Sequence, residues 1–385
     1  MDFNLSEEHR MLRDSVYNFA VKEFGPIAEE MDREDILPDW VFPRMGELGI
    51  LGITIPEEYG GAGSDLLSAV IAVEQLARVS PSIALSYGAH ANLCANNIKN
   101  NANEEQKNKY LPPLCTGEHI GAMALTEPGA GSDAVGIQTT AVRDGDFYIL
   151  NGTKMFITNG PVANTFVLYA KTDKKKGAHG ITAFIIEKDF PGFSVSRKLE
   201  KVGHRGSPTA ELVLEDCCVP VENVEGEVDK GINVMMSGLD IERAFFAGEA
   251  LGIAEACFDL SVKFAKERVQ FGKPIASFQL IQAKLADMYT NIEAARLLTY
   301  KAAIEADKAE RGGSGTEIHK LAAASILFSA EMATKVALEA VQIYGGYGYM
   351  LEYPIQRFFR DAKLLEIGAG TSEIRRLIIA GEILK

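Results

Sequence analysis

The chain has 385 residues, of which 47% are hydrophobic and 24% charged, a balance that is ordinary for a folded protein of two or three domains. Its 39 basic and 53 acidic residues give a net charge of -14, which disfavours nucleic acid and anionic membrane surfaces as partners. We therefore expect no nucleic-acid partner. We also expect no membrane insertion, because no apolar run approaches the length that spans a bilayer.

Cysteine and histidine patterns argue against disulfides and metals. The five cysteines are odd in number and lack a CxxC spacing, so we expect reduced thiols. The six histidines are scattered, without a ligand pair such as HExxH, so no metal site is expected. The first residues lack the pattern of a targeting peptide, and a cytoplasmic location is expected.

The first part of the chain has a helical hydrophobic period. Ser6 is placed to cap a first helical turn that carries two glutamates, and apolar residues recur at helical spacing from Leu12 onward. Further helices are predicted over residues 66–79 and 82–99. The pattern predicts an all-α N-terminal domain over residues 1–120.

The middle part has a different texture. From residue 121 to about residue 225, β-branched and aromatic runs are separated by Gly, Asp and Asn turns, which is typical of an antiparallel β domain. The dipeptides Asp144-Gly145 and Asn151-Gly152 are each predicted to form a hairpin turn.

A glycine-rich stretch, GAGSDAVG at residues 129–136, superficially resembles a phosphate-binding loop. A dinucleotide fingerprint needs a strand before it and a helix after it, whereas hairpin strands are predicted to follow here. We therefore interpret this stretch as a glycine turn.

The helical period returns in the last part of the chain. Long helices are predicted over residues 230–268, 276–310 and 316–344, with a loop at residues 309–317 and a last helix from Thr371. Strands do not alternate with helices, so a parallel doubly wound sheet is disfavoured. The predicted fold class is α+β multidomain, with an N-terminal all-α domain (1–120), a middle antiparallel β domain (121–225) and a C-terminal four-helix-bundle-like α domain (226–385).

Glu242 is the most unusual charged residue of the pattern. On a helix its neighbours at three and four residues are Gly238, Leu239, Phe245 and Phe246, an apolar stripe without a basic partner. If this carboxylate is buried, desolvation raises its pKa and suits it to general-base work near neutral pH. The alternative is a solvated side chain on a poorly assigned face. Nearby, Asp240 and Arg243 are three residues apart and can pair.

Four motifs resemble, in the same order, those of the acyl-CoA dehydrogenases. These flavoenzymes remove the α-proton and the β-hydride of an acyl-CoA thioester to give a 2-enoyl-CoA. The motifs are LTEPGAGSD from residue 125, MFITNG from residue 155, ERVQFGKPIASFQLIQ from residue 267 and QIYGGYGY from residue 342. Each is a weak signal alone, but their order within a three-part architecture makes the whole chain similar to this family.

The resemblance implies FAD as the cofactor and assigns contacts to it. The segment at residues 267–282 is implied to reach the FAD of a neighbouring subunit, so a homotetramer is implied. Electron-transferring flavoprotein is implied as the electron acceptor. The implied FAD-binding residues are Leu125, Thr126, Ser132, Phe156, Ile157, Thr158, Arg268, Phe271, Gln279, Gln342, Gly345, Gly346, Thr371, Ser372 and Glu373.

The chain departs from many members of the family in the turn before GTS. There the straight-chain and glutaryl-CoA dehydrogenases carry an aromatic residue and the catalytic glutamate, whereas this chain has Gly368 and Ala369. Isovaleryl-CoA and long-chain dehydrogenases place the base on the GLDIER helix, which implies Glu242 as the catalytic residue. The Ala369 N–H is expected to bond the thioester oxygen. The implied substrate-binding residues are Ser132, Asp240, Arg243, Gly368, Ala369 and Gly370.

The small turn residues bear on the substrate. They leave space beside the acyl chain, which favours a short branched acyl-CoA such as isovaleryl-CoA; an alicyclic or another short or medium acyl-CoA is the alternative. A remote alternative is a non-catalytic relative that binds FAD or acyl-CoA. Glu249 stands where a small residue is expected in isovaleryl-type enzymes. We interpret it as a structural or interface carboxylate in preference to a polar group near the acyl tail.

Overall fold

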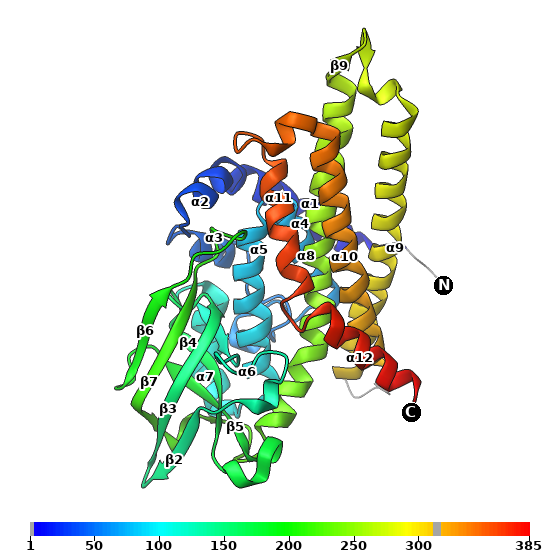
Figure 1. Cartoon of the computed structure of the whole chain (residues 1–385). Helices are drawn as coiled ribbons and strands as arrows, with labels where there is room; N and C mark the ends of the chain where they lie inside the picture. The colour runs from blue at the N-terminus through cyan, green and yellow to red at the C-terminus, as the bar shows by residue number, and fades with distance from the viewer. Residues whose placement is uncertain (1–3, 311–316) are drawn as a thin grey trace.

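The computed structural model describes residues 4–310 and 317–385, so most of the predicted loop at residues 309–317 lies outside the described residues. Three regions follow one another along the chain: short helices, a twisted sheet, and a bundle of long helices (Figure 1). The predicted α+β architecture is confirmed.

The N-terminal region is helical. Ser6 caps its first helix as predicted, because its Oγ accepts a hydrogen bond from the N–H of His9 at 3.1 Å. A π-helical segment, Ala89–Ala95, joins α5 to α6, so the helix predicted over residues 82–99 is continuous but irregular in its middle. The helices are α1 (Glu7–Glu23), α2 (Ala28–Glu34), α3 (Val41–Glu47), α4 (Leu66–Ala77), α5 (Pro81–Gly88), α6 (Asn96–Asn101) and α7 (Glu104–Thr116).

The middle region is an eight-stranded sheet. Seven strands follow one another in the order β6-β7-β3-β2-β4-β5-β8, and the eighth, β1, pairs with β4. The strands are β1 (Gly121–Ala124), β2 (Thr140–Asp144), β3 (Phe147–Thr158), β4 (Thr165–Lys171), β5 (Ile181–Glu187), β6 (Phe193–Lys198), β7 (Thr209–Pro220) and β8 (Val224–Glu225). Both β1 and β2 pair with β4 in parallel, so the sheet is mostly but not wholly antiparallel.

One predicted hairpin and the glycine turn are confirmed. Asp144 pairs with Phe147 across the tight turn that joins β2 to β3. In the stretch at residues 129–136, Glu127 and Ala130 bridge across a turn, and a single 3-10 turn leads into β2. No helix follows the glycines, and the chain has no dinucleotide fingerprint there.

The second predicted hairpin, at Asn151-Gly152, is wrong. Both residues lie inside β3, where the register with β7 shifts between Leu150 and Gly152. The Asn151 amide donates to the Asp216 carboxylate of β7 at 3.0 Å. Glycine is required at 152 because a Cβ there would lie 2.4 Å from the Oγ1 of Thr139. A bulge and a hairpin turn use the same residue types, so the local sequence did not separate them.

The C-terminal region is a helical bundle with a small hairpin at its tip, far from the sheet (Figure 1). Its long helices α8, α9 and α10 pack along one another, and α11 lies beside α8. The elements are α8 (Gly231–Glu267), β9 (Val269–Gln270), β10 (Lys273–Pro274), α9 (Gln279–Glu310), α10 (Ile318–Tyr344), α11 (Ile355–Ala362) and α12 (Ser372–Ile383).

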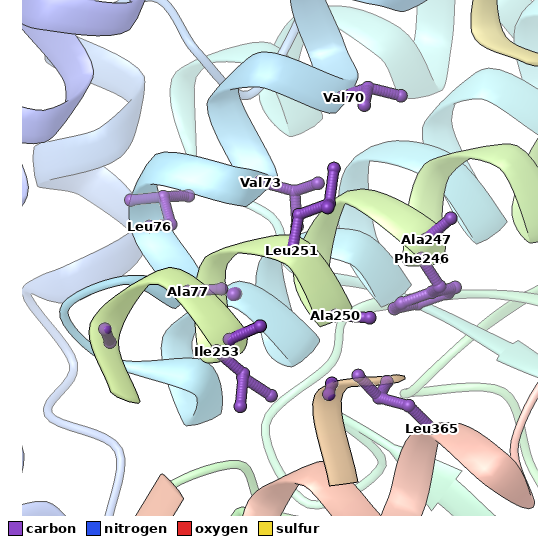
Figure 2. Close-up of a cluster of buried hydrophobic side chains, with 14 of the residues drawn as sticks. Val70, Val73, Leu76, Ala77, Phe246, Ala247, Ala250, Leu251, Ile253 and Leu365 are labelled. Carbon is purple, nitrogen blue, oxygen red and sulfur yellow. The ribbon is translucent and has the colours of Figure 1, made fainter. Parts of the chain in front are cut away.

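Helices α4 and α8 join the first and last regions in one core. Figure 2 shows Val70 and Val73 of α4 together with Ala247 and Leu251 of α8. The helices approach closely, since a Cβ on Gly252 would lie 2.1 Å from the backbone oxygen of Glu74. This packing fixes α8 just beyond Glu242.

Among the described residues, one segment, Ile318–Tyr349, is long and apolar enough by composition to cross a membrane. The expectation that no apolar run approaches this length was therefore wrong for α10. Just over half of its most apolar window, 56%, is buried inside the protein. Packing against α8 and α9 accounts for its apolar character, because a central bundle helix is covered on several sides.

Candidate active site

Glu242 lies in the first half of α8, and its side chain is only 6% exposed. The carboxyl group forms no hydrogen bond with any described residue. Burial raises its pKa to about 7, while the positive charges of Arg243 and Arg375 oppose the shift. A buried, unpaired carboxyl group that ionises near neutral pH has the properties of a general base.

The ion pair predicted beside Glu242 is present. The Arg243 guanidinium donates to the Asp240 carboxylate at 2.9 Å, and both side chains are buried. His319 of α10 contacts the second oxygen of Asp240. His319 was not predicted from the sequence, because it lies on another helix and no local spacing relates it to Asp240.

The turn at residues 368–370 consists of small residues and has an irregular backbone. Ala369 has a φ of 55° and Gly370 a φ of 88°, so two successive residues are left-handed. Beside Gly368 there is room for a side chain, since a Cβ would meet only the Leu364 oxygen at 3.6 Å. Thr371 caps the helix α12 that follows, accepting from the N–H of Ile374 at 3.3 Å.

Arg375 connects this turn to Glu242. Its side chain is fully buried, its Nη2 donates to the carbonyl oxygen of Gly368, and its charge lowers the pKa of Glu242. Glu242 and Arg375 are far apart in the sequence, and no pattern in the local sequence indicated their proximity.

The first two flavin motifs lie against each other near the end of β3, an inner strand of the sheet. The N–H of Met155 donates to the Thr126 oxygen at 2.8 Å, which places Leu125 and Thr126 beside the end of β3. In that strand Ile157 is buried, but Phe156 is 67% exposed at a φ of 63°. An aromatic ring held out on an irregular backbone is a surface that a planar cofactor can cover.

The other two flavin motifs form a separate cavity of about 510 Å³ near the tip of the bundle. The Arg268 guanidinium lies 5.1 Å from the Tyr347 ring centre. Gly345 and Gly346 expose their backbone to open space, since a Cβ on either would meet nothing within 4 Å. The described cavity is lined by Phe264, Arg268, Gln270, Ile275, Ile343, Tyr344, Gly345, Gly346, Tyr347 and Met350.

One chain does not bring the two groups of motifs together. Arg268 directly follows α8 and is 26 residues beyond Glu242, which is about 39 Å at 1.5 Å per residue. Phe271, at the hairpin tip, is 93% exposed. Gln279 begins α9, and Gln342 lies near the end of α10.

The residues of both places suit FAD. At the end of β3, the exposed Phe156 ring offers a face for the flavin, and Ser132, six residues after Thr126, is also exposed. The Ser372 hydroxyl, at the start of α12 beside Glu373, is buried without a hydrogen-bond partner among the described residues. The distant cavity combines a guanidinium, aromatic rings and open glycine backbone, which suits an anionic dinucleotide.

Glu249 points to a different part of the molecule. It is fully buried, and its carboxyl oxygen lies 3.7 Å from the Nδ1 of His204, in the loop before β7. The His204 ring also contacts the backbone oxygen of Asp361 in α11 at 2.9 Å. Burial raises the pKa of Glu249 well above its usual value, and the charge of Asp361 adds to the shift. These neighbours favour the structural interpretation of Glu249.

Residues 4–310 and 317–385 contain no group of three or more His, Cys, Asp or Glu side chains that could hold a metal ion. The five cysteines are free thiols, and four of them are buried.

Comparison with known proteins identifies the class. Three family models cover the chain: the acyl-CoA dehydrogenase N-terminal domain matches residues 6–118, the middle domain residues 122–217 and the C-terminal domain residues 229–384. The chain therefore belongs to the acyl-CoA dehydrogenase family, and it is an FAD-dependent dehydrogenase of acyl-CoA substrates.

Individual relatives differ in the substrates that their names give. Isovaleryl-CoA dehydrogenase, mitochondrial, of Solanum tuberosum is 52% identical over 98% of this chain and 91% of its own. Butyryl-CoA dehydrogenase of Megasphaera elsdenii is 44% identical, with a TM-score of 0.96 and full coverage of both chains. A chain from a structure described as the electron transferring flavoprotein of Acidaminococcus fermentans is 46% identical, with the same TM-score and coverage.

Proposed function

We propose that the protein oxidises a short branched acyl-CoA, such as isovaleryl-CoA, to the corresponding 2-enoyl-CoA, and that Glu242 is the catalytic base. One observation carries the proposal: Arg375 acts with its charge on the buried carboxyl group of Glu242 and bonds to the turn of small residues, where there is room beside Gly368. The 52% identity to an isovaleryl-CoA dehydrogenase supports the same substrate class.

The proposed chemistry uses two groups of the chain at the thioester. The N–H of Ala369 donates to the thioester oxygen and stabilises the negative charge that develops there. Glu242 takes the α-proton and holds it on a carboxyl oxygen. When bound, FAD supplies a hydride acceptor for the β-carbon, so a proton and a hydride leave and a carbon–carbon double bond forms. Burial of Glu242 keeps water from the acidic α-carbon.

The remaining site residues are proposed to bind and position. Asp240 and Arg243 hold the CoA moiety and the base, together with Ser132 and Gly370. The proposed FAD contacts near the base are Leu125, Thr126, Ser132, Phe156, Ile157, Thr158, Thr371, Ser372 and Glu373. Those that serve the FAD of a neighbouring subunit are Arg268, Phe271, Gln279, Gln342, Gly345 and Gly346.

A homotetramer is proposed because the two groups of FAD contacts lie far apart in one chain. The exposed apolar residues Phe271 and Leu280, 93% and 81% accessible, lie where a neighbouring subunit would cover them. Electron-transferring flavoprotein is the proposed electron acceptor, and the similarity to a chain from a structure described by that name supports it. The proposed location is cytoplasmic.

An alicyclic acyl-CoA is the second candidate substrate, because the space beside Gly368 suits a ring as well as a branch. The 44% identity to a butyryl-CoA dehydrogenase keeps short straight chains in the comparison.

The test is an anaerobic titration of the purified FAD-loaded protein with acyl-CoA thioesters. The visible absorption of the flavin is recorded at each addition. Isovaleryl-CoA is expected to bleach the flavin band at a lower molar ratio of thioester to protein than butyryl-CoA, glutaryl-CoA or cyclohexanecarboxyl-CoA. Bleaching by the cyclic thioester alone would keep the chemistry and replace the substrate. Absence of bleaching with every thioester would contradict the proposal.

A further inference from the structure

Arg375 is a buried cation whose hydrogen bonds are only partly used. Its side chain is fully buried, its Nη2 donates to the Gly368 oxygen, and its Nε and Nη1 have no partner among the described residues. A buried guanidinium with two nitrogens that donate to no acceptor is costly, so its placement requires an explanation.

The acceptor of that bond belongs to the peptide unit that matters for the substrate. The carbonyl of Gly368 and the N–H of Ala369 are the two ends of one peptide plane, and the described chain has no cis peptide bonds. In a trans peptide these groups point in opposite directions. Arg375 therefore fixes one end of the plane, and the N–H of Ala369 must point away from it.

The backbone after this peptide also requires support. Ala369 has a φ of 55°, a conformation that a residue other than glycine keeps only where its surroundings hold it. The N–H of Ala369 donates to no acceptor among the described residues, so it is available to a ligand. A charged donor on the carbonyl polarises the peptide and makes this N–H a stronger hydrogen-bond donor.

The charge of Arg375 also fits the proposed reaction. The burial of Arg375 lowers its pKa to about 10, and the charge of Glu242 is the largest influence in the opposite direction. Once Glu242 has taken a proton its charge is lost, while negative charge develops on the thioester oxygen at the other end of the same peptide. The cation is thus balanced before and during the proton transfer.

We propose that Arg375 is a positioning residue that orients and polarises the Gly368–Ala369 peptide, so that the Ala369 N–H recognises the thioester carbonyl. The proposal rests on the proposed function, because it assumes that an acyl thioester binds at this turn. Arg375 acts through the peptide and not by contact with the substrate.

The test compares two CoA ligands that differ at the carbonyl. One is 3-methylbut-2-enoyl-CoA, a thioester, and the other is S-(3-methylbutyl)-CoA, a thioether without a carbonyl oxygen. Their dissociation constants are measured by calorimetry with the FAD-loaded protein, for the wild type, Arg375→Met and Arg375→Lys. Arg376→Met is the matched control, since the neighbouring Arg376 is half exposed and pairs with Glu331 on the surface.

The wild type is expected to prefer the thioester, and Arg375→Met to lower that preference about five- to ten-fold, the worth of one good hydrogen bond. Arg375→Lys should lose part of it, since an ammonium does not fix the peptide plane. The control should keep it. If Arg375→Met fails to bind FAD, the ratio in Arg375→Lys decides.

A second measurement separates positioning from a purely structural role. Because Arg375 lowers the pKa of Glu242, the pH profile of kcat/KM should move to higher pH in Arg375→Met. Equal weakening of both ligands, or an unchanged preference for the thioester, would overturn the role of Arg375 and leave the proposed function standing. A wild type without any preference would instead contradict the proposed carbonyl site itself.

Discussion

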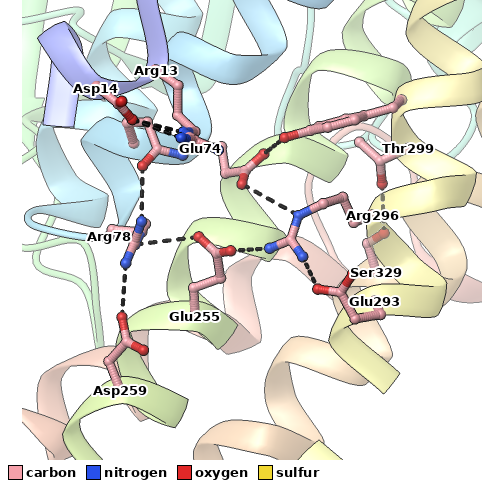
Figure 3. Close-up of polar contacts among 12 residues, drawn as sticks. Arg13, Asp14, Glu74, Arg78, Glu255, Asp259, Glu293, Arg296, Thr299 and Ser329 are labelled. Carbon is pink, nitrogen blue, oxygen red and sulfur yellow. Dashed lines mark hydrogen bonds and ion pairs between the residues drawn. The ribbon is translucent and has the colours of Figure 1, made fainter. Parts of the chain in front are cut away.

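Helix α8 carries two acids with opposite surroundings, the partly buried Glu255 and the buried Glu242. Glu255 lies in a network in which Arg296 and Arg78 contact its carboxylate, and Arg296 also reaches Glu74 at 3.8 Å (Figure 3). Tyr300 donates to Glu74 at 2.8 Å. Thirteen residues earlier on the same helix, Glu242 has no hydrogen-bonding partner among the described residues.

The difference between Glu255 and Glu242 distinguishes an acid that stabilises the fold from an acid that is suited to chemistry. In the Glu255 network every acid has a cation or a hydroxyl, so the buried charges are compensated and link α4, α8 and α9. Glu242 is buried without a cation or hydroxyl in hydrogen-bonding contact, although the charges of Arg243 and Arg375 act on it, and it is left to respond to a ligand. Active sites commonly keep such groups at a cost in stability.

The largest effect is expected from Glu242→Gln. Removal of a general base lowers turnover by roughly 10²–10⁴-fold, while FAD should stay bound because the amide keeps the shape of the side chain. Turnover with isovaleryl-CoA and the flavin spectrum are measured on the same preparation. Near-normal turnover would mean that another carboxylate is the base.

Arg296→Met is expected to lower stability and not the chemistry. It leaves Glu74, Glu255 and Glu293 without a shared cation, and loss of one partner from a buried ion network costs about 3–5 kcal/mol. Urea unfolding measures the loss, and turnover per bound FAD should be unchanged. Arg376→Met, which removes a surface pair, should cost less than about 1 kcal/mol.

Glu242→Gln should itself stabilise the protein at high pH. The folded-state pKa of about 7 lies above the ordinary glutamate pKa of 4.5, so the wild type gains from the protonated acid below pH 4.5 and loses that gain as the pH rises through 7. At pH 8 the variant should be more stable by up to about 3 kcal/mol, at 1.4 kcal/mol per pKa unit. Urea midpoints at pH 5 and pH 8 measure the difference, which should fall below about 1 kcal/mol at the lower pH.

The same pKa predicts the pH dependence of activity. Glu242 must be ionised to take a proton, so kcat/KM should fall about ten-fold per pH unit below about pH 7 and level off above it. A profile flat from pH 5 to pH 9 would contradict the assignment of the base.

The smallest effect is expected from Glu249→Gln. Burial raises the pKa of Glu249 and so favours its neutral form, which an amide matches in shape, so the substitution should change little. Turnover and the order of acyl-CoA preference should stay within about two-fold of the wild type, which a general-base role would not allow. A changed preference would place Glu249 near the acyl tail.

Local sequence patterns were enough to predict the fold class and to single out Glu242, the proposed base. Helical and strand periods predicted the three regions, because side-chain spacing on one element follows from its local geometry. The same spacing placed Glu242 on an apolar stripe and paired Asp240 with Arg243, since all of these contacts lie within one helix.

Only the tertiary structure decided what reaches these residues from elsewhere. Arg375 comes to Glu242 from α12, His319 to Asp240 from α10, and His204 to Glu249 from the sheet. The bulge at Gly152 likewise depends on Thr139, in another part of the chain. Local periodicity carries no information about such contacts, because packing of distant segments and the burial that it causes decide which charges are paired and which are left for chemistry.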